Sequence, residues 1–191
     1  MNSLYRRVIK RILDLIIGVI LLFLLGWLII VLSIVIVLAE GRPVFFKQKR
    51  VGQYGRPFNI YKFRTMVKNA EKIGPKQTNR EDSRITKVGK LLRKTSLDEL
   101  PQIVNLIKGD MSVVGYRPGV YENYTENDFK SGMFDVKPGI TGYAQVNGRS
   151  SLSLEEKRMW ELKYVKDISF CVDLLIILKT IKVVISRSNS Y

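Results

Sequence analysis

The sequence contains no histidine, and its 191 residues include one cysteine, Cys171. The missing histidines exclude a histidine general base and histidine metal ligands. A single cysteine excludes an intramolecular disulfide and a cysteine-rich zinc site. Acid–base or covalent chemistry is therefore left to Asp, Glu, Lys, Tyr or Ser side chains. The lone thiol also suits a reducing compartment.

Negative charge is scarce: 17 acidic residues face 32 basic ones, which gives a net charge of +15. Such an excess indicates anionic partners, which are phosphorylated ligands, acidic lipids or nucleic acid. The cations are dispersed along the chain and do not cluster in one stripe, so we expect no nucleic-acid partner. The length suits one domain with a modest core.

Charge is absent altogether from residues 15–39, which are nearly all aliphatic. As a helix this run would be ~37 Å long, enough to cross a hydrocarbon core of ~30 Å. The run is too long for a signal peptide and lacks a small-residue cleavage site. A buried helix of this length would need a larger soluble domain around it. We therefore predict an N-terminal membrane segment, residues 1–43, followed by one domain, residues 44–191.

The sequence leaves the topology of this helix open. Hydropathy alone favours a helix that spans the bilayer, whereas a re-entrant helix would keep both flanking cationic clusters on the cytoplasmic side. Gly26 permits a bend near the middle, and we expect Asp14 to pair with a neighbouring Arg or Lys. The flanking clusters are Arg6, Arg7, Lys10 and Arg11 before the run, and Arg42, Lys47, Lys49 and Arg50 after it.

Beyond the membrane segment the pattern predicts short elements. Gly52, Gly55 and Pro57 punctuate extended segments in residues 44–66, and residues 71–86 are expected to form a surface loop. Apolar spacing predicts helices at residues 87–94, 103–107 and 155–165, and an amphipathic interfacial helix at residues 169–185. The predicted fold class is α+β, mainly α, with a β-hairpin in one small cytoplasmic domain.

Two adjacent carboxylates, Asp98 and Glu99, lie where a helix is expected to begin. Ser96 precedes Glu99 by three residues, the spacing of a capping box, so we predict that Ser96 is the N-cap. The positive end of the helix dipole would then keep Asp98 ionised. An ordinary capped helix without chemistry has the same pattern.

Several cations could bind phosphate. Arg117, held between Tyr116 and Pro118, is a candidate bidentate clamp, or else a surface arginine in a turn. Cations alternate with aromatics in residues 60–66, which could form a phosphate-binding edge or an amphipathic strand. These residues include Lys62 and Arg64.

Four motifs follow one another along the chain: KFRTM at residues 62–66, SLDELPQ at 96–102, GDMS with VG and RP within 109–118, and PGITG with QVNGR within 138–149. Their order resembles the bacterial sugar transferases, which are the monotopic phosphoglycosyl transferases that start glycoconjugate assembly. The resemblance covers nearly the whole chain. Larger relatives carry further N-terminal membrane helices and another domain, so the chain resembles the minimal catalytic form.

The resemblance implies transfer of a sugar 1-phosphate from a UDP-sugar to undecaprenyl phosphate, with release of UMP. Asp98 would be the nucleophile that forms a phosphosugar-aspartyl intermediate, and Mg²⁺ would assist. Asp98 and Glu99 are the expected metal ligands, although Glu99 could instead assist proton transfer. The expected phosphate contacts are Arg117 first, then Arg93 and Arg149, then Lys62 and Arg64.

The resemblance also implies a location at the bacterial inner membrane, with membrane lipid around a re-entrant helix and the catalytic domain facing the cytoplasm. The family breaks this helix at a Ser–Pro pair, where this chain has Gly26-Trp27. It also has Tyr116 in place of a usual proline and Tyr143 in place of a frequent tryptophan. A non-catalytic membrane anchor or scaffold and an inactive relative remain alternatives. The sugar, the pathway and the oligomeric state stay open, with a homodimer among the possibilities.

Overall fold

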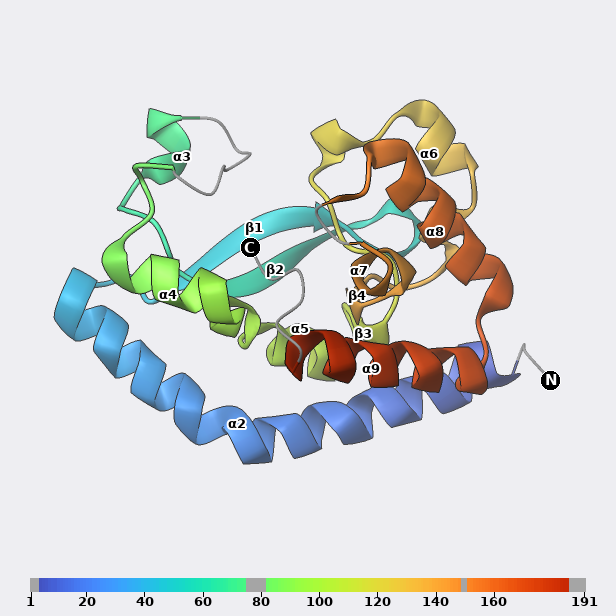
Figure 1. The fold of residues 1–191 in the computed structure, drawn as a ribbon, viewed down its shortest axis with the longest axis horizontal. Helices are drawn as coiled ribbons and strands as arrows, with labels where there is room; N and C mark the ends of the chain where they lie inside the picture. The colour runs from blue at the N-terminus through green and yellow to red at the C-terminus, as the bar shows by residue number, and fades with distance from the viewer. Residues whose placement is uncertain (1–3, 75–81, 149–150, 186–191) are drawn as a thin grey trace.

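The computed structural model describes residues 4–74, 82–148 and 151–185. One long N-terminal helix runs along the lower edge of a domain built from short helices and two small sheets (Figure 1). Each of these sheets has two strands. The predicted α+β, mainly helical fold is therefore confirmed.

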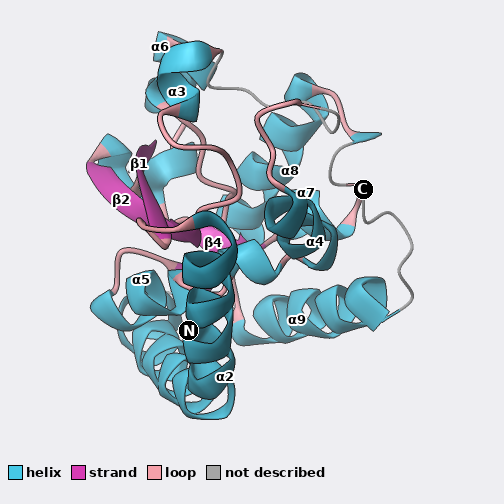
Figure 2. Cartoon of the chain, turned by 90° about the vertical axis from the view of Figure 1, so that its left-hand side faces the viewer, coloured by secondary structure: helices cyan, strands magenta, loops and turns pink. Residues whose placement is uncertain are grey.

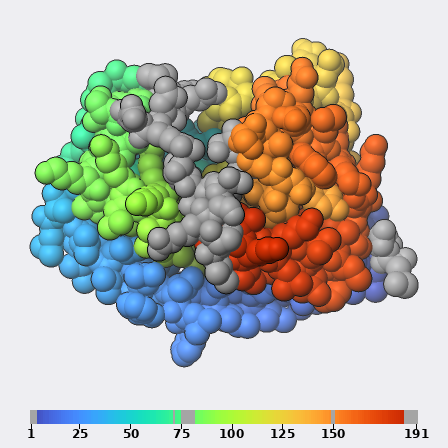
Figure 3. All heavy atoms as spheres, in the orientation of Figure 1, coloured from blue at the N-terminus to red at the C-terminus, as the bar shows by residue number. Residues whose placement is uncertain are grey.

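The N-terminal helix is continuous. A π-helical turn, η1 (Tyr5–Ile9), leads directly into α2 (Lys10–Glu40). Together they are long and apolar enough to cross a membrane by length and composition. Most of the apolar side chains of α2 are exposed, with Phe23 at 86% and Leu38 at 81%. This exposure rules against a helix buried in a soluble core, and Figure 3 shows α2 as an edge beneath the other elements.

Polar contacts bind the first half of α2 to the domain. Lys10 Nζ lies 2.5 Å from Oδ2 of Asp173. The buried Asp14 accepts hydrogen bonds from Ser112 Oγ at 3.0 Å and Val113 N at 2.9 Å. The predicted pairing of Asp14 with a neighbouring cation is therefore wrong, because neutral donors from the domain occupy its carboxylate.

The far end of α2 is bound to the same domain. Arg64 Nη2 donates to the backbone oxygens of Glu40 at 3.0 Å and Gly41 at 2.7 Å, where the helix leaves carbonyl groups without partners. Between its two ends α2 bends, and its middle lies farthest from the domain (Figure 1). The helix is thus held at both ends by one body.

The predicted hairpin is confirmed. Strands β1 (Phe45–Val51) and β2 (Pro57–Phe63) pair antiparallel through the turn η2 (Gln53–Gly55). Gly55 has a φ of +73°, which suits glycine in a tight turn. Gln48 pairs with Ile60, and Phe46 pairs with Lys62, so these side chains share a face of the hairpin.

Short helices follow the hairpin: α3 (Ala70–Ile73), α4 (Lys87–Thr95), the 3₁₀ turn η3 (Leu97–Glu99) and α5 (Gln102–Lys108). The predicted loop at residues 71–86 thus begins in α3. Ser96 has a φ of +58° and ends α4, and its side chain caps no helix. The predicted capping box is wrong because Ser96 adopts the left-handed C-cap conformation.

A second sheet is a parallel pair of strands; a short strand was expected within residues 109–118, but its parallel pairing was not predicted. Strand β3 (Ser112–Val114) pairs with β4 (Gly139–Thr141). Gly115 is required at this crossing, since a Cβ there would lie 2.2 Å from the carbonyl oxygen of Lys137. Between the two strands the chain forms η4 (Tyr121–Asn123), α6 (Glu126–Lys130) and η5 (Met133–Asp135).

The chain ends in α7 (Tyr143–Val146), α8 (Leu154–Asp167) and α9 (Phe170–Ile185). The predicted helices at residues 155–165 and 169–185 are confirmed. Helices α9 and α2 both lie along the lower edge of the molecule (Figure 2). Helix α9 exposes apolar side chains there, including Phe170, Leu174, Leu178 and Ile181.

Candidate active site

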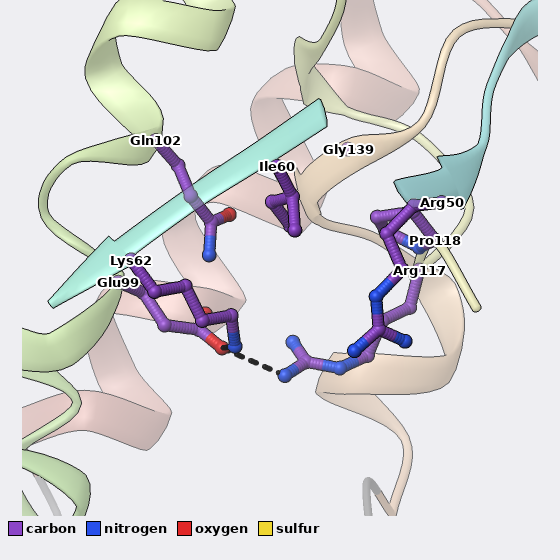
Figure 4. Close-up of a pocket in the computed structure, with 8 residues that line it drawn as sticks. All are labelled: Arg50, Ile60, Lys62, Glu99, Gln102, Arg117, Pro118 and Gly139. Atoms are coloured by element: carbon purple, nitrogen blue, oxygen red, sulfur yellow. Dashed lines mark hydrogen bonds and ion pairs between the residues drawn. The ribbon is translucent and has the colours of Figure 1, made fainter. Parts of the chain in front are cut away.

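A small pocket of about 90 Å³ lies between the hairpin, the start of α5 and the turn after β3 (Figure 4). The hairpin contributes a cation from each strand, and η3 contributes a carboxylate. The turn after β3 adds an arginine. The lining residues are Arg50, Ile60, Lys62, Glu99, Gln102, Arg117, Pro118 and Gly139.

Glu99 holds two cations at this pocket. Its Oε1 accepts from Lys62 Nζ at 2.7 Å and from Arg117 Nη2 at 2.9 Å. Burial by itself would raise the pKa of Glu99, but the charges of Arg117 and Lys62 outweigh burial and hold that pKa well below its usual range. Glu99 therefore stays ionised and fixes two cations from separate elements.

Asp98, its neighbour, is different. It is half-buried, and its carboxylate accepts no hydrogen bond from the described residues. Burial raises the pKa of Asp98, and the charge of Lys62 opposes this rise. The predicted support of ionised Asp98 by a helix dipole lacks its helix start, because residues 97–99 form a short 3₁₀ turn without a capping side chain.

Arg50 lines the pocket, although the sequence marked it only as one of the cations that follow the apolar run. Its Nη2 donates to Gln48 at 2.5 Å, while its buried Nε has no hydrogen-bond partner among the described residues. Burial, then the charge of Arg117, lower the pKa of Arg50. Figure 4 shows both arginines at the same side of the pocket. The period-two alternation of the hairpin, which places Arg50 on the face of Lys62, could have revealed it.

Glu161 and Gln102 were also not predicted as site residues from the sequence. Glu161 on α8 is buried and accepts from the backbone N–H of Arg117 at 3.1 Å. Burial raises the pKa of Glu161 to about 7. Gln102, at 3% exposure, lines the pocket from the first turn of α5. No local pattern marks Glu161, because its partner Arg117 lies 44 residues away in the sequence.

The remaining predicted site residues lie elsewhere. Arg93 Nε donates to Thr65 Oγ1 at 2.9 Å, outside the pocket lining, although its charge acts on Asp98. Arg64 is not at the pocket, because its guanidinium binds the end of α2. Arg149 lies outside the described residues. The structure thus brings together Lys62, Glu99 and Arg117.

Tyr116, the residue before Arg117, is fixed by the core. Its ring is fully buried against Phe134, with ring centroids 5.3 Å apart, and its hydroxyl donates to the carbonyl oxygen of Val51 at 3.0 Å. Packing therefore supplies the rigidity before Arg117 that a proline ring would supply through its backbone.

The donor atoms for a metal ion at this pocket are few. Among the described residues no three His, Cys, Asp or Glu side chains gather in one place. Glu99 is the carboxylate that lines the pocket, and one of its oxygens already binds Lys62 and Arg117, whereas Asp98 is its neighbour in sequence and is not among the lining residues. Mg²⁺ is commonly held by one or two carboxylates together with substrate phosphates. The acid pair fits a magnesium ion that binds together with a phosphorylated substrate.

A long exposed apolar helix and a pocket lined by three cations and the carboxylate of Glu99 define a membrane-associated protein with a site suited to phosphates. The family model of the bacterial sugar transferases matches residues 5–187. The chain belongs to this family, as the order of its motifs predicted.

Individual relatives support the same assignment. The chain is 42% identical to the "uncharacterized sugar transferase EpsL" of Bacillus subtilis, over 93% of this chain and 88% of that protein. It is 38% identical to the UDP-glucose:undecaprenyl-phosphate glucose-1-phosphate transferase of Escherichia coli, over 92% of this chain and 40% of that protein. An Aeromonas hydrophila protein, named as a UDP-N-acetylgalactosamine-undecaprenyl-phosphate N-acetylgalactosaminephosphotransferase, is 37% identical over 93% of this chain and 44% of its own length. These names confirm the predicted class of enzyme.

Proposed function

We propose that the protein transfers a sugar 1-phosphate from a UDP-sugar to undecaprenyl phosphate and releases UMP, as the first membrane step of glycoconjugate synthesis. The names of its relatives support this reaction. The observation that carries the proposal is the asymmetry of the acid pair. Glu99 is occupied by Lys62 and Arg117, whereas the carboxylate of Asp98 accepts no hydrogen bond within the described part of the chain.

Asp98 is the proposed nucleophile. Its carboxylate oxygen attacks the β-phosphorus of the UDP-sugar, and the bond from that phosphorus to the bridging oxygen breaks. The electron pair leaves with UMP, and the sugar phosphate is joined to Asp98 as an acyl phosphate. A phosphate oxygen of undecaprenyl phosphate then attacks the same phosphorus. The bond to Asp98 breaks, which frees its carboxylate and gives the lipid diphosphosugar.

The cations of the pocket make this attack feasible. A carboxylate approaches an anionic diphosphate only where positive charge neutralises both groups. Arg117 and Arg50 are placed to bind phosphate oxygens, and Glu99 positions Lys62 beside Asp98. Mg²⁺, held by Asp98 and Glu99 together with the substrate, would supply further positive charge at the diphosphate.

We further propose that α2 is re-entrant and that the domain faces the cytoplasm. The contacts at the two ends of α2 support this topology, because Lys10 and Asp14 bind the domain at one end and Glu40 and Gly41 bind it at the other. A helix that spans the bilayer would place one of these ends across the membrane from its partners. The soluble UDP-sugar then reaches the pocket from the cytoplasm, and the lipid acceptor reaches it from the bilayer.

Release of UMP by the protein in nanodiscs tests the reaction. The assay contains undecaprenyl phosphate, Mg²⁺ and a panel of UDP-sugars. We expect release with at least one sugar, no release from Asp98→Asn, and normal release from the matched control Glu126→Gln, whose side chain is 90% exposed. Asp98→Asn should remain in the membrane fraction. Turnover by purified Asp98→Asn would contradict the nucleophile, and full activity in a chelator would remove Mg²⁺ from the scheme.

A covalent intermediate requires a second readout. With a UDP-sugar labelled in the β-phosphate and no lipid acceptor, we expect label bound to the protein that hydroxylamine removes, as it does from acyl phosphates. The label should be absent from Asp98→Asn. UMP release that depends strictly on undecaprenyl phosphate, without any labelled protein, would favour direct transfer.

A further inference from the structure

A second cavity, of about 780 Å³, lies beside the N-terminal end of α2. Its walls are η1 and the first turns of α2, the turn of the hairpin, the segment before β4 and the end of α8. It shares no lining residue with the catalytic pocket. The lining residues are Arg6, Arg7, Lys10, Arg11, Asp14, Gln53, Tyr54, Ser112, Asp135, Val136, Lys137, Lys166 and Ile168.

Positive charge dominates this cavity, which is lined by six cations and two carboxylates. Some of these charges are already bound. Lys10 pairs with Asp173, and Asp14 accepts from Ser112. Arg11 donates to the carbonyl oxygens of Leu106 and Ile107 at 2.8 and 2.7 Å, where α5 ends. The bound charges therefore hold α2 on the domain.

The other four of the six cations have no such partner. They come from three separate parts of the chain, namely η1, the segment before β4 and the end of α8. Within the described ranges their side chains form no hydrogen bond and no ion pair. They are Arg6, Arg7, Lys137 and Lys166.

Lys137 is the informative member of this set. It is half-buried, and burial, followed by the charge of Arg11, lowers its pKa. The carboxylates of Asp14 and Asp110 oppose this shift, but they do not outweigh burial and the charge of Arg11, so the charged form of Lys137 is destabilised in the free protein. An anion in the cavity would relieve this repulsion. The cavity thus has the electrostatics of an anion site.

The cavity lies at the start of the long apolar helix. Its lining residues from η1 and α2 belong to the stretch Tyr5–Glu40, which is long and apolar enough to cross a membrane. Phe170, at the start of α9, is 52% exposed, and its ring contacts Tyr5 with centroids 6.2 Å apart. A soluble anion would need no apolar helix beside its site, whereas a lipid has both a phosphate for the cations and acyl chains for the apolar side chains.

We propose that this cavity binds the phosphodiester headgroup of an anionic glycerophospholipid, whose acyl chains lie along the apolar faces of α2 and α9. One lipid phosphate would bind η1, Lys137 and Lys166 together and would so strengthen the attachment of α2 to the domain. This site is separate from that of the lipid acceptor, which must reach Asp98.

Native mass spectrometry of the protein with equal amounts of phosphatidylglycerol and phosphatidylcholine tests the site. We expect the wild type to retain phosphatidylglycerol several-fold over phosphatidylcholine. The double variant Lys137→Gln/Lys166→Gln should lose this preference. The matched double variant Lys72→Gln/Lys130→Gln, which removes two exposed lysines outside the cavity, should keep it. Equal losses in the two doubles would overturn the proposal in favour of general surface charge.

Two further measurements separate a bound lipid from misfolding and from a soluble anion. Arg7→Gln removes an exposed side chain that forms no hydrogen bond or ion pair within the described ranges, so it should keep the fold and weaken the preference. Glycerol phosphate at millimolar concentration should leave the retained lipid in place. A wild type without lipid preference that nonetheless binds glycerol phosphate or inorganic phosphate in the cavity would overturn the lipid and indicate a soluble anion.

Discussion

The carboxylate of Glu161 accepts a hydrogen bond from the backbone N–H of Arg117, with 3.1 Å between the two atoms. The side chain of the same arginine binds Glu99. Two carboxylates thus position one cation, one through its backbone and the other through its guanidinium. They differ in acidity, because burial raises the pKa of Glu161 to about 7, whereas Arg117 and Lys62 outweigh burial at Glu99 and lower its pKa.

The pH dependence of stability should report Glu161. Its folded-state pKa lies above the ordinary value of 4.5, so the folded protein binds this proton more tightly than the unfolded chain. The resulting stability is complete below pH 4.5 and is lost as the pH rises to about 7. Glu161→Gln keeps the acceptor oxygen but cannot ionise. Between pH 5 and 8 the unfolding free energy of the wild type should fall by roughly 3 kcal/mol more than that of Glu161→Gln. Denaturant titrations at both pH values measure this difference, with the exposed Glu155→Gln on the same helix as control. Parallel pH slopes for wild type and Glu161→Gln would refute it.

Arg50 should contribute to substrate binding and not to stability. Its buried Nε has no partner among the described residues, so the free protein gains little from it. We expect Arg50→Gln to lower kcat/KM for the UDP-sugar by tenfold or more and to leave the unfolding temperature unchanged or higher. Arg56→Gln, an exposed arginine in the turn of the same hairpin, should change neither quantity. A lower unfolding temperature with unchanged kinetics would assign Arg50 a structural role.

The ion pair between Lys10 and Asp173 should be a main anchor of α2. Asp173 is 5% exposed and also accepts from the hydroxyls of Tyr5 and Tyr164. Asp173→Asn leaves Lys10 without its counterion and should destabilise the protein by about 3–5 kcal/mol. Adding Lys10→Met should restore part of this loss.

An exposed ion pair is the control for this anchor. Lys163 and Asp167 lie 2.9 Å apart, with side chains 55% and 31% exposed. Asp167→Asn should change the unfolding free energy by less than about 1 kcal/mol. Equal effects of Asp167→Asn and Asp173→Asn in denaturant titrations would show that α2 does not depend on its buried pair.

Cysteine labelling should decide the topology of α2. In a Cys171→Ser background, single cysteines replace Arg7 and Arg42, and a third replaces Lys130 as a marker of the domain. A re-entrant helix places all three on one side, so a membrane-impermeant maleimide should label all of them in inverted vesicles and none in intact spheroplasts. Opposite accessibility of positions 7 and 42 would show that the helix spans the bilayer.

Local sequence patterns predicted the elements better than their contacts. The apolar run at residues 15–39, the glycine-punctuated hairpin and the helices near the C-terminus follow from periodicity and composition. Ser96 shows the limit. Its spacing from Glu99 fits a capping box, but α4 packs Leu92 against Ile36 and Phe63 and ends at Ser96 in a left-handed turn. Tertiary packing decided that conformation.

The candidate site likewise contains residues that local motifs predict and residues that only long-range contacts bring in. The acid pair and Arg117 stand in motifs, so resemblance identified them. Glu161 contacts Arg117 across 44 residues of sequence, and Asp14 contacts Ser112 across 98. Lys10 and Arg11 are within one turn of Asp14 and were the obvious partners, yet each binds a distant group instead. No local pattern specifies such long-range choices.

The anchoring of α2 has a consequence for biogenesis. Lys10 is synthesised 163 residues before Asp173, and Arg11 is synthesised 95 residues before the carbonyl group of Leu106 that it binds. At about 5–20 residues per second, the apolar helix leaves the ribosome roughly 8–30 s before its last anchor exists. During that interval the helix lacks the domain contacts that hold it in the folded protein. If α2 enters the membrane as proposed, its insertion can precede folding of the domain, and synthesis of Asp173 then supplies the last of these contacts.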